Sequence, residues 1–519
     1  MKKRFIIIFS FVVCCLCHAS IAQLQLPIIF TDNMVLQQNM ELPVWGSSCK
    51  NCKVEVSFND ITKRTYSDNN GQWKLRLPSI KAGGPYTLKV SDKHATILLK
   101  NILVGEVWLC SGQSNMEWRL EQSSNAKEEI PNANFNQIRL FSMVAQSKAR
   151  PLANVVFSDS LLDALQKGTF YEPTTWQVCT PSSASKFSAV AYYFGKALHQ
   201  KLNVPIGLIC NAVGGTTTQA FIDSISLASH PQLQQFIGSK NGLKWFETAK
   251  EIHPWVLERS KENLQKTLND SNTARTFLHP FAPSFLYKKG IQPLVPFAIK
   301  GVIWYQGESN ATHPTIHDVL FETLAKNWRI AWQQADLPIY TVQLPAIANR
   351  SRWPAFRESQ MRLSERIKNS GIAIMIDTGD SLDVHPTQKQ VVGERLSLLA
   401  LAKTYHQRIV YTGPTLTRFE QKGNIVHLFF NNTNNLKTSD GQSPKGFVLQ
   451  GYNLGGTQEI IIDIDDKVTI LPTEIVITLP TYIQAIQIKY AWKPNPSCNI
   501  VNEVDLPLAP FKIELDGNF

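Results

Sequence analysis

The residues from Gly105 to Glu117 read Gly-Glu-Val-Trp-Leu-Cys-Ser-Gly-Gln-Ser-Asn-Met-Glu, and the rest of the chain is interpreted around this stretch. An apolar run, Val107–Cys110, stops at a cluster of small and polar residues that includes Ser114. The pattern predicts a buried strand that ends in a turn, with the serine on the turn. Ligands of open α/β sheets bind at the carboxyl edge of the strands, where such a hydroxyl would lie. By itself the cluster is also typical of an ordinary turn or a helix N-cap, so its meaning depends on the rest of the chain.

Residues 101–405 alternate strand-like apolar runs with segments of helical spacing. Further apolar runs are found at 204–209, 297–305, 337–344 and 372–376, and helical spacing at 190–202 and 319–334. This rhythm predicts an α/β domain, a parallel sheet with helices on both faces. Each run ends in polar or glycine-rich residues, so these ends would line one edge of the sheet. Residues 222–295 are less regular, and we expect an inserted segment beside that edge.

Both flanks of this region have the alternating sequence pattern that is typical of β-structure. Residues 23–100 contain short alternating runs separated by Gly, Pro and Asn turn signals, which predicts a small β-sandwich. Residues 406–519 return to the same pattern and predict a second β-domain. A chain of 519 residues is too long for a single core, and roughly two to four domains are expected.

Residues 1–22 predict a cleaved secretory signal peptide. The basic residues 2–4 precede an apolar segment, 5–17, and Ser20-Ile21-Ala22 forms a small-x-small cleavage site. The apolar segment is too short for a stable membrane span, and no later segment has the uninterrupted apolar length of one. We therefore expect a periplasmic or secreted protein with no membrane span after the signal is removed.

Charge and cysteine content exclude several classes of partner and site. The formal charge is +11, but Lys and Arg are scattered and form no basic stripe with aromatic residues, so no nucleic-acid partner is expected. Cys49 and Cys52 form a Cys-x-x-Cys pair without the second pair that a zinc site usually needs. In an exported chain this pair predicts a local disulfide. Cys110 and Cys210 end apolar runs and are expected as buried free thiols.

Three strand-end clusters and one later segment carry the candidate chemistry. They are the Ser114 turn, the pair Gly214-Gly215, the block Gln306–Asn310, and residues 377–386, which contain His385. A nucleophilic serine needs a base to take its proton, and histidine is the usual one. The oxyanion of acyl transfer needs preorganised N–H donors, which glycine backbones and an amide side chain can supply. The order of these groups along the chain is typical of a hydrolase with its site at the sheet edge.

Several segments of the chain resemble motifs of a known family. Gly112–Met116, Trp304–Asn310 and Asp383–Pro386 resemble motifs of the sialate O-acetylesterase family of SGNH/GDSL-type hydrolases. The likeness extends to Asp32–Gln37, Gly105–Trp108, Arg357–Gln360 and Tyr490–Pro496, so it covers nearly the whole mature chain. It implies a three-layer α/β/α domain flanked by β-domains. It also implies a serine esterase, without metal or cofactor, that removes acetyl groups from sugars, most of all from O-acetylated sialic acid.

The resemblance also implies roles for single residues. Ser114 would be the nucleophile and His385 the general base. The oxyanion hole would consist of the backbone N–H groups of Ser114 and of Gly214 or Gly215, with the side chain of Gln306 as a further donor. Apart from the resemblance, five more side chains are candidates for contact with the substrate: Gln113, Glu308, Asn310, Arg357 and Gln360. For Glu308 we also expect a buried carboxylate that organises its loop, and for Arg357 and Gln360, which have helical spacing, a pair on the helix surface stays open.

The acid partner of His385 departs from the pattern of the wider superfamily. In that superfamily the catalytic acid stands three residues before the histidine, and Leu382 occupies that position here. Asp383 is the nearest carboxylate, and residues two apart on an extended segment point to the same side. We predict Asp383 as the third catalytic residue, while Asp380 and a backbone carbonyl stay open as alternatives.

Other functions stay open as well. One is the same chemistry on another glycan, such as acetylated xylan. A non-catalytic glycan-binding protein on the same scaffold is disfavoured because Ser114 and His385 are both present. A metal-dependent hydrolase is the third. His313 and His317 are four apart, but Pro314 lies between them and the glutamate of a His-Glu-x-x-His zinc motif is absent, so we expect loop residues and no metal site.

Overall fold

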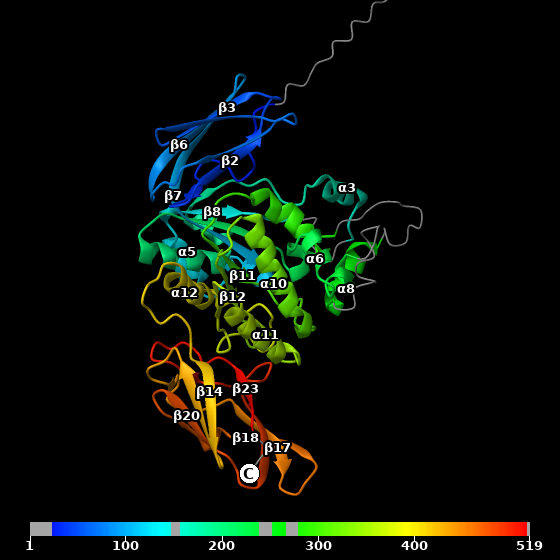
Figure 1. Cartoon of the computed structure of the whole chain (residues 1–519), viewed down its shortest axis with the longest axis vertical. Helices are drawn as coiled ribbons and strands as arrows, with labels where there is room; N and C mark the ends of the chain where they lie inside the picture. Colours follow the sequence, from blue (N-terminus) through cyan, green and yellow to red (C-terminus); the bar gives the residue numbers. More distant parts are fainter. Residues whose placement is uncertain (1–22, 147–155, 238–251, 266–278, 516–519) are drawn as a thin grey trace, which may run out of the picture.

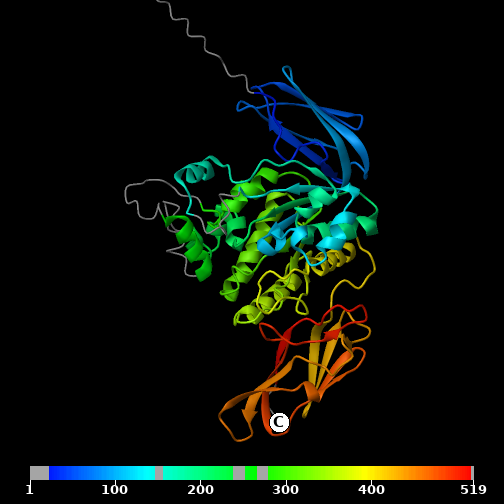
Figure 2. The ribbon, with the colours of Figure 1, turned by 180° about the vertical axis from the view of Figure 1, so that it is seen from behind.

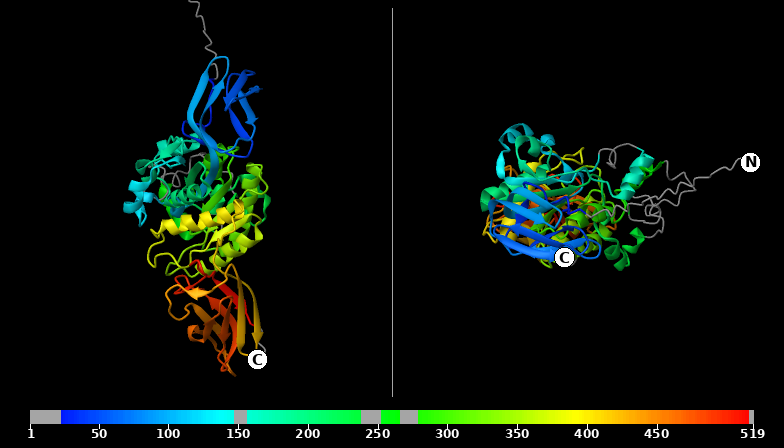
Figure 3. Two further views of the ribbon diagram at one scale, coloured as in Figure 1. Left: turned by 90° about the vertical axis from the view of Figure 1, so that its left-hand side faces the viewer. Right: turned by 90° about the horizontal axis from the view of Figure 1, so that it is seen from above.

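The computed structural model describes residues 23–146, 156–237, 252–265 and 279–515. Three regions stack along the long axis in Figure 1: a β-region in blue, a central α/β region, and a second β-region in orange and red. The reverse view in Figure 2 and the left view in Figure 3 show the same stacking. The predicted signal peptide, 1–22, lies outside the described residues, as do parts of the predicted insertion.

A mostly parallel sheet forms the centre of the molecule, in the order β13-β12-β11-β7-β10-β8-β9. Its strands are β7 (Thr96–Gly112), β8 (Phe135–Ser142), β9 (Gln177–Cys179), β10 (Ile206–Ala212), β11 (Gly301–Tyr305), β12 (Ile339–Val342) and β13 (Ser370–Ala373). All neighbours run parallel except β8 and β9, which form an antiparallel edge. Strands β10 and β11 are buried along their whole length, as expected for continuous apolar runs in a parallel sheet. The predicted parallel sheet is confirmed.

The strand order reverses at β7, which lies between β10 and β11. Gly112, the last residue of β7, is in register with Ala212 of β10 and with Tyr305 of β11, so three strands end side by side. A Cβ atom on Gly112 would lie 2.1 Å from the carbonyl oxygen of Tyr305, and φ is +143°, so only glycine fits this close approach. Such a switch point is where open α/β sheets bind ligands.

Helices cover both faces of the sheet, as predicted. On one face α5 (Ala189–Leu202) packs against α12 (Lys389–Leu399), and on the other α10 (Pro314–Ala331) packs against α11 (Trp353–Arg366) (Figure 1). Shorter helices are α1 (Ser114–Glu117), α2 (Ala126–Glu129), α3 (Asp159–Lys167), α4 (Pro181–Ser185), α6 (Ser224–Ser229) and α8 (Pro254–Asn263). The result is the three-layer α/β/α architecture. Nowhere in the described ranges is there a helix long and apolar enough to cross a bilayer.

The N-terminal β-region is joined to the central sheet without a linker. Its strands are β1 (Val35–Gln37), β2 (Leu42–Ser47), β3 (Lys53–Phe58), β4 (Ile61–Tyr66), β5 (Gln72–Leu77) and β6 (Gly83–Ser91). Strand β7, 17 residues long, pairs with β6 and β1 at its start and with β10 and β11 at its end. The boundary predicted between residues 100 and 101 therefore falls inside one continuous strand.

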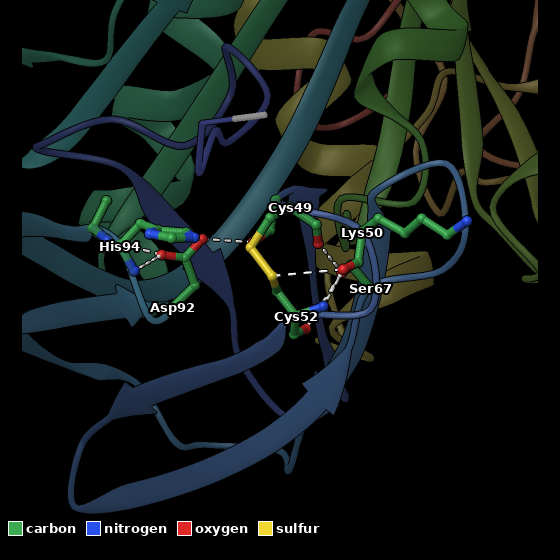
Figure 4. Close-up of a disulfide and its surroundings, with 8 residues drawn as sticks. Cys49, Lys50, Cys52, Ser67, Asp92 and His94 are labelled. Atoms are coloured by element: carbon green, nitrogen blue, oxygen red, sulfur yellow. Dashed lines mark hydrogen bonds between the residues drawn. A yellow bond between two sulfur atoms is a disulfide. The ribbon is translucent and has the colours of Figure 1, made fainter. Parts of the chain in front are cut away.

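The Cys49–Cys52 disulfide staples a turn at the edge of the N-terminal β-region (Figure 4). The Ser67 hydroxyl accepts the backbone N–H of Cys52 at 2.9 Å and donates to the carbonyl oxygen of Cys49. The predicted local disulfide is thus confirmed. Cys110 and Cys210 are buried free thiols, as predicted, and lie in register on the neighbouring strands β7 and β10.

The C-terminal β-region has a core of its own between two four-stranded sheets, β14-β15-β20-β19 and β18-β17-β21-β23. Their strands are β14 (Thr415–Lys422), β15 (Ile425–Asn431), β17 (Phe447–Asn453), β18 (Glu459–Asp463), β19 (Val468–Ile470), β20 (Glu474–Thr478), β21 (Ile483–Tyr490) and β23 (Phe511–Glu514). A short pair, β16 (Lys437–Thr438) and β22 (Ile500–Val501), accompanies them. The predicted second β-region is confirmed.

Candidate active site

Ser114 stands where β7 ends, as the first residue of the short helix α1. Its Oγ atom lies 2.8 Å from Nε2 of His385, which comes from the loop between β13 and α12. That loop is held beside the end of β12, because the N–H groups of Ala346 and Ala348 donate to the carbonyl oxygens of Thr378 and Ser381. A hydroxyl within hydrogen-bond distance of an imidazole is the arrangement of a nucleophile and its base.

The ring of His385 stacks on Trp118, the residue after α1, with centroids 5.3 Å apart and planes 18° apart. Partial burial lowers the pKa of His385 below its ordinary value of 6.5. Asp383 opposes this shift, while the cation of Lys389 adds to it. A lowered pKa keeps the imidazole neutral at neutral pH, and the neutral form is the one that accepts a proton.

Asp383 is the carboxylate that lies beside His385. Its Oδ1 atom is 3.6 Å from Nδ1 of His385, beyond hydrogen-bond distance, and accepts the backbone N–H of His385 at 2.8 Å. Its side chain is 61% exposed. Asp380 instead accepts the N–H groups of Leu382 and Asp383, which lower its pKa, so it shapes the turn before His385. The catalytic role of Asp383 stays a prediction.

The expected oxyanion-hole amides differ in their hydrogen bonds. The N–H of Gly214 donates to a carboxylate oxygen of Glu117 at 2.8 Å. Among the described residues, the backbone N–H groups of Ser114 and Gly215 make no hydrogen bond to a backbone carbonyl oxygen outside the helices and strands. Unoccupied amide donors are what a developing oxyanion requires. Gly215 is therefore a better candidate than Gly214.

Gln306 does not have the role that we predicted. Its Nε2 group donates to the carbonyl oxygen of Thr216 at 3.2 Å and to Oδ1 of Asn310 at 2.7 Å. Its Oε1 atom accepts the hydroxyl of Thr218 at 2.7 Å. Both amide hydrogens are thus taken by protein groups, and the side chain is buried. The prediction of Gln306 as an oxyanion donor is wrong.

Gln113 and Asn310 are buried and shape the site, whereas we predicted contact with the substrate. Oε1 of Gln113 accepts the N–H groups of Gly307 and Ser309, each at 3.4 Å, which ties the nucleophile turn to the loop after β11. Oδ1 of Asn310 accepts the N–H of Thr218, and its Nδ2 donates to Gln219. Together these bonds hold the three strand-end loops in one arrangement.

Arg357 and Gln360 are buried, and their polar groups bond to the backbone, which contradicts their predicted contact with the substrate. The Arg357 guanidinium donates to the carbonyl oxygens of Leu344 and Pro345, and also to those of Lys493 and Pro494 near the C-terminal β-region. Burial lowers its pKa to about 9. Gln360 bonds the backbone of Val342 and Leu344. Both side chains on α11 brace the end of β12.

The two histidines considered as metal ligands belong to helix α10. His313 is its N-cap residue, while His317 lies inside the helix, buried, with its ring 4.2 Å from that of Phe356. Burial lowers the pKa of His317 to about 4. The prediction of a loop is therefore wrong for His317. The described ranges contain no group of three or more side chains suited to hold a metal ion.

The inserted region reaches the edge of the site. A Cβ atom on Gly215 would lie 2.7 Å from the ring of Trp255, on α8, and 2.8 Å from that of Phe281. The backbone of Gly215 has φ of +75°, which favours glycine. Two aromatic rings from the insertion therefore press against the loop that holds the candidate oxyanion amide.

Sequence reasoning missed Lys389, whereas the expectation of Glu308 as a buried carboxylate that organises its loop agrees with the structure. Lys389, at the start of α12, is fully buried and donates to Oδ1 of Asn115. Nδ2 of Asn115 in turn donates to Oε1 of Glu308. One signal was present in the sequence, because a lysine at the first position of a helix lies against the helix dipole and is unfavourable without another reason. Glu308 therefore lies directly beneath the nucleophile turn, and contact with the substrate is not its observed role.

Comparisons with known proteins identify the family of this chain. Residues 282–400 match the family described as carbohydrate esterase, sialic acid-specific acetylesterase. Sialate O-acetylesterase of Mus musculus is 28% identical over 428 residues, covering 75% of this chain and 76% of its own length, and that of Homo sapiens is 27% identical over 423 residues, covering 75% and 73%. A solved carbohydrate acetylesterase from Xanthomonas citri is 30% identical with a TM-score of 0.75, covering 95% of this chain and 99% of its own. The chain therefore belongs to the sialate O-acetylesterase family of carbohydrate esterases, and it is a carboxylic ester hydrolase that removes acetyl groups from sugars.

Proposed function

We propose that this protein hydrolyses O-acetyl esters of sialic acid, with Ser114 as nucleophile and His385 as general base. The observation that carries the proposal is the distance of 2.8 Å between Oγ of Ser114 and Nε2 of His385. The lowered pKa of His385 supports it, since a neutral imidazole is ready to accept the hydroxyl proton. The names of the curated mouse and human relatives support sialic acid as the sugar.

The reaction takes two steps. In the first, Oγ of Ser114 attacks the acetyl carbonyl while its proton passes to Nε2 of His385, and the oxyanion is stabilised by the N–H groups of Ser114 and Gly215. The tetrahedral intermediate collapses when His385 gives the proton to the departing sugar oxygen, which leaves an acetyl ester on Ser114. In the second step His385 takes a proton from water and the resulting hydroxide attacks the acetyl carbonyl. The intermediate collapses when His385 returns the proton to Oγ of Ser114, which releases acetate and restores the free serine and the neutral histidine.

We propose that Asp383 stabilises the imidazolium form of His385 that appears in each step. A carboxylate at 3.6 Å from Nδ1 favours the charged ring by its field even without a hydrogen bond. Because the side chain is largely exposed, this stabilisation is weaker than that of a buried acid.

We also propose that the enzyme acts outside the cytoplasm, in the periplasm or after secretion. The basic start, the apolar segment and the small-x-small site within residues 1–22 support this proposal. The Cys49–Cys52 disulfide supports it as well, because such bonds persist in oxidising compartments.

Substrate preference and the covalent intermediate test the proposal. Acetate release from O-acetylated sialic acid is measured beside release from acetylated xylo-oligosaccharides, with a chelator present and absent. We expect a higher kcat/KM on the sialic acid, no effect of the chelator, and an acetyl group on the Ser114 peptide in acid-quenched samples. A higher kcat/KM on the xylo-oligosaccharides would contradict the sugar, and loss of activity with the chelator would contradict the mechanism.

A further inference from the structure

A fully buried lysine lies beside the proposed catalytic pair. Lys389 is the first residue of α12, four residues after His385. Burying an ammonium group is costly, and the positive end of the helix dipole adds to the cost. The Lys389 cation faces the rings of Trp118 and Tyr305, at 5.5 and 5.6 Å from their centroids, which offsets part of it. The buried ammonium group of Lys389 therefore needs specific hydrogen-bond and charge partners.

Asn115 is the neighbour that accepts a hydrogen bond from this ammonium group. Its Oδ1 atom accepts from Nζ of Lys389, and its Nδ2 group donates to Oε1 of Glu308 and, at 2.9 Å, to the carbonyl oxygen of Val384. An ammonium group only donates, and a carbonyl oxygen only accepts, so the amide of Asn115 fits in one orientation. All of its hydrogen-bonding groups are engaged, and the side chain has no exposure.

Glu308 closes the network on the other side. Its second carboxylate oxygen is buried and has no hydrogen-bond partner in the described part of the chain. Burial raises the pKa of Glu308, against the opposing effect of its bond from Asn115 and of the Lys389 cation. Burial lowers the pKa of Lys389 to about 7, and the Glu308 charge opposes that shift. Asn115 thus bridges a buried acid and a buried base that support each other's charge.

The network ends on the neighbours of both proposed catalytic residues. Asn115 follows Ser114, and Val384 precedes His385, so one amide joins the backbones of the nucleophile turn and the histidine loop. A second connection runs through Trp118, whose ring contacts both Lys389 and His385. The side chain of Asp383, in contrast, is exposed and beyond hydrogen-bond distance of Nδ1.

We propose that Asn115, Lys389 and Glu308 form a positioning network that holds His385 against Ser114 and supplies the orientation that Asp383 supplies only weakly. The inference rests on the proposed roles of Ser114 and His385. None of the three residues touches the reacting atoms in this scheme, so they are positioning residues. A base displaced by about 1 Å loses on the order of 100-fold in rate, which sets the size of the effect.

The charges around His385 make the network measurable in a pH profile. Lys389 faces the ring region from α12 and lowers the pKa of His385, whereas Asp383, on the same loop, raises it. Glu308, on the loop after β11, acts on this region through Asn115 and Lys389. Removing the Lys389 charge should raise the pKa of His385 and move the acid limb of kcat/KM to higher pH.

Two variants and a matched control test the proposal, on the full chain and per mole of folded protein measured by near-ultraviolet circular dichroism. Asn115→Ala removes the link and should lower kcat by on the order of 100-fold with KM changed little. The double variant Lys389→Met with Glu308→Gln removes both charges together, so it avoids an unpaired buried ion, and should move the acid limb to higher pH. Lys196→Met is the matched control, because Lys196 is a partly buried lysine paired with Glu129 at 2.5 Å on another part of the same layer.

The control should lower the melting temperature and leave both kcat and the acid limb unchanged. A wild-type kcat for folded Asn115→Ala would overturn the proposal, and so would an acid limb that does not move in the double variant. Ser114→Ala separates this failure from failure of the proposed function. Full activity of Ser114→Ala would rule out the catalytic pair itself. An inactive Ser114→Ala together with a fully active Asn115→Ala would rule out only the positioning network.

Discussion

Ser114 and His385 are 271 positions apart in the chain, and their reacting atoms are 2.8 Å apart in the fold. The strand order produces this meeting, because β7 ends between β10 and β11 while the histidine loop returns beside the end of β12. No local feature of either segment would hold the two side chains together. The network of Asn115, Lys389 and Glu308 joins the two segments beneath the pair.

The pH dependence of the enzyme should reflect the burial of His385. Its pKa lies below 6.5, so the neutral base persists to a lower pH than an exposed histidine would allow. We expect kcat/KM to stay level through neutral pH and to fall only on the acid side of 6.5, as the ring takes a proton. A profile of acetate release against pH checks this, and an acid limb centred above 6.5 would contradict it.

Asp383→Asn should be a mild variant. Removing a buried triad acid costs about 10⁴-fold in kcat, but Asp383 is 61% exposed and 3.6 Å from Nδ1, so we expect a loss of about 10-fold. Because Asp383 raises the pKa of His385, its loss should move the acid limb to lower pH. This shift is opposite in direction to the one expected for the double variant Lys389→Met with Glu308→Gln. A loss near 10⁴-fold would show that Asp383 is a full triad member.

Gly215→Ala should damage catalysis, since a Cβ atom there would meet the rings of Trp255 and Phe281 and the loop would shift. Misplacing one oxyanion donor costs roughly 100-fold in kcat. Gly168→Ala is the control, because Gly168 has φ of +96° at the end of α3 and a Cβ there meets only the Lys289 amine. The control should lose about 1 kcal/mol of stability and no kcat. Equal kcat in both variants would argue against an oxyanion amide at Gly215.

Arg357→Ala should loosen the join between the central and C-terminal regions. The guanidinium serves four carbonyl oxygens, and leaving them without a donor should cost about 3 kcal/mol, seen as a lower melting temperature. Arg362→Ala, on the same helix, breaks an exposed pair with Asp318 and should cost less than about 1 kcal/mol. If Arg357→Ala melted like the control while losing substrate binding, the original prediction of a substrate contact would regain support.

Much of this architecture could be predicted because it depends on local patterns. Apolar runs that end in small polar residues located β7, β10 and β11, and parallel strands must bring such ends to one edge. The placement of Ser114 and the Gly214-Gly215 pair at this edge follows from that rule, whereas the roles expected of these residues and of His385 came from the family resemblance. The continuity of β7 could not be predicted, since an alternating segment and a fully buried one look like two separate strands.

The roles of long polar side chains were harder to predict from the sequence. Gln306, Arg357 and Gln360 have motif positions suited to a site, yet their donors serve nearby carbonyl groups in the interior. Whether an amide or guanidinium faces a cleft or a backbone depends on tertiary packing, which spacing does not encode. Lys389 was missed for the same reason, because a lysine is ordinarily expected at the surface.

Acetate release from O-acetylated sialic acid, measured for wild-type enzyme and for Ser114→Ala under the same conditions, shows whether Ser114 is the nucleophile. The hydroxyl of Ser114 is the proposed nucleophile, and its removal leaves His385 with no partner to activate. We predict a fall in kcat on the order of 10⁴-fold or more in a folded variant. If Ser114→Ala released acetate within a few-fold of the wild-type rate, Ser114 would not be the nucleophile.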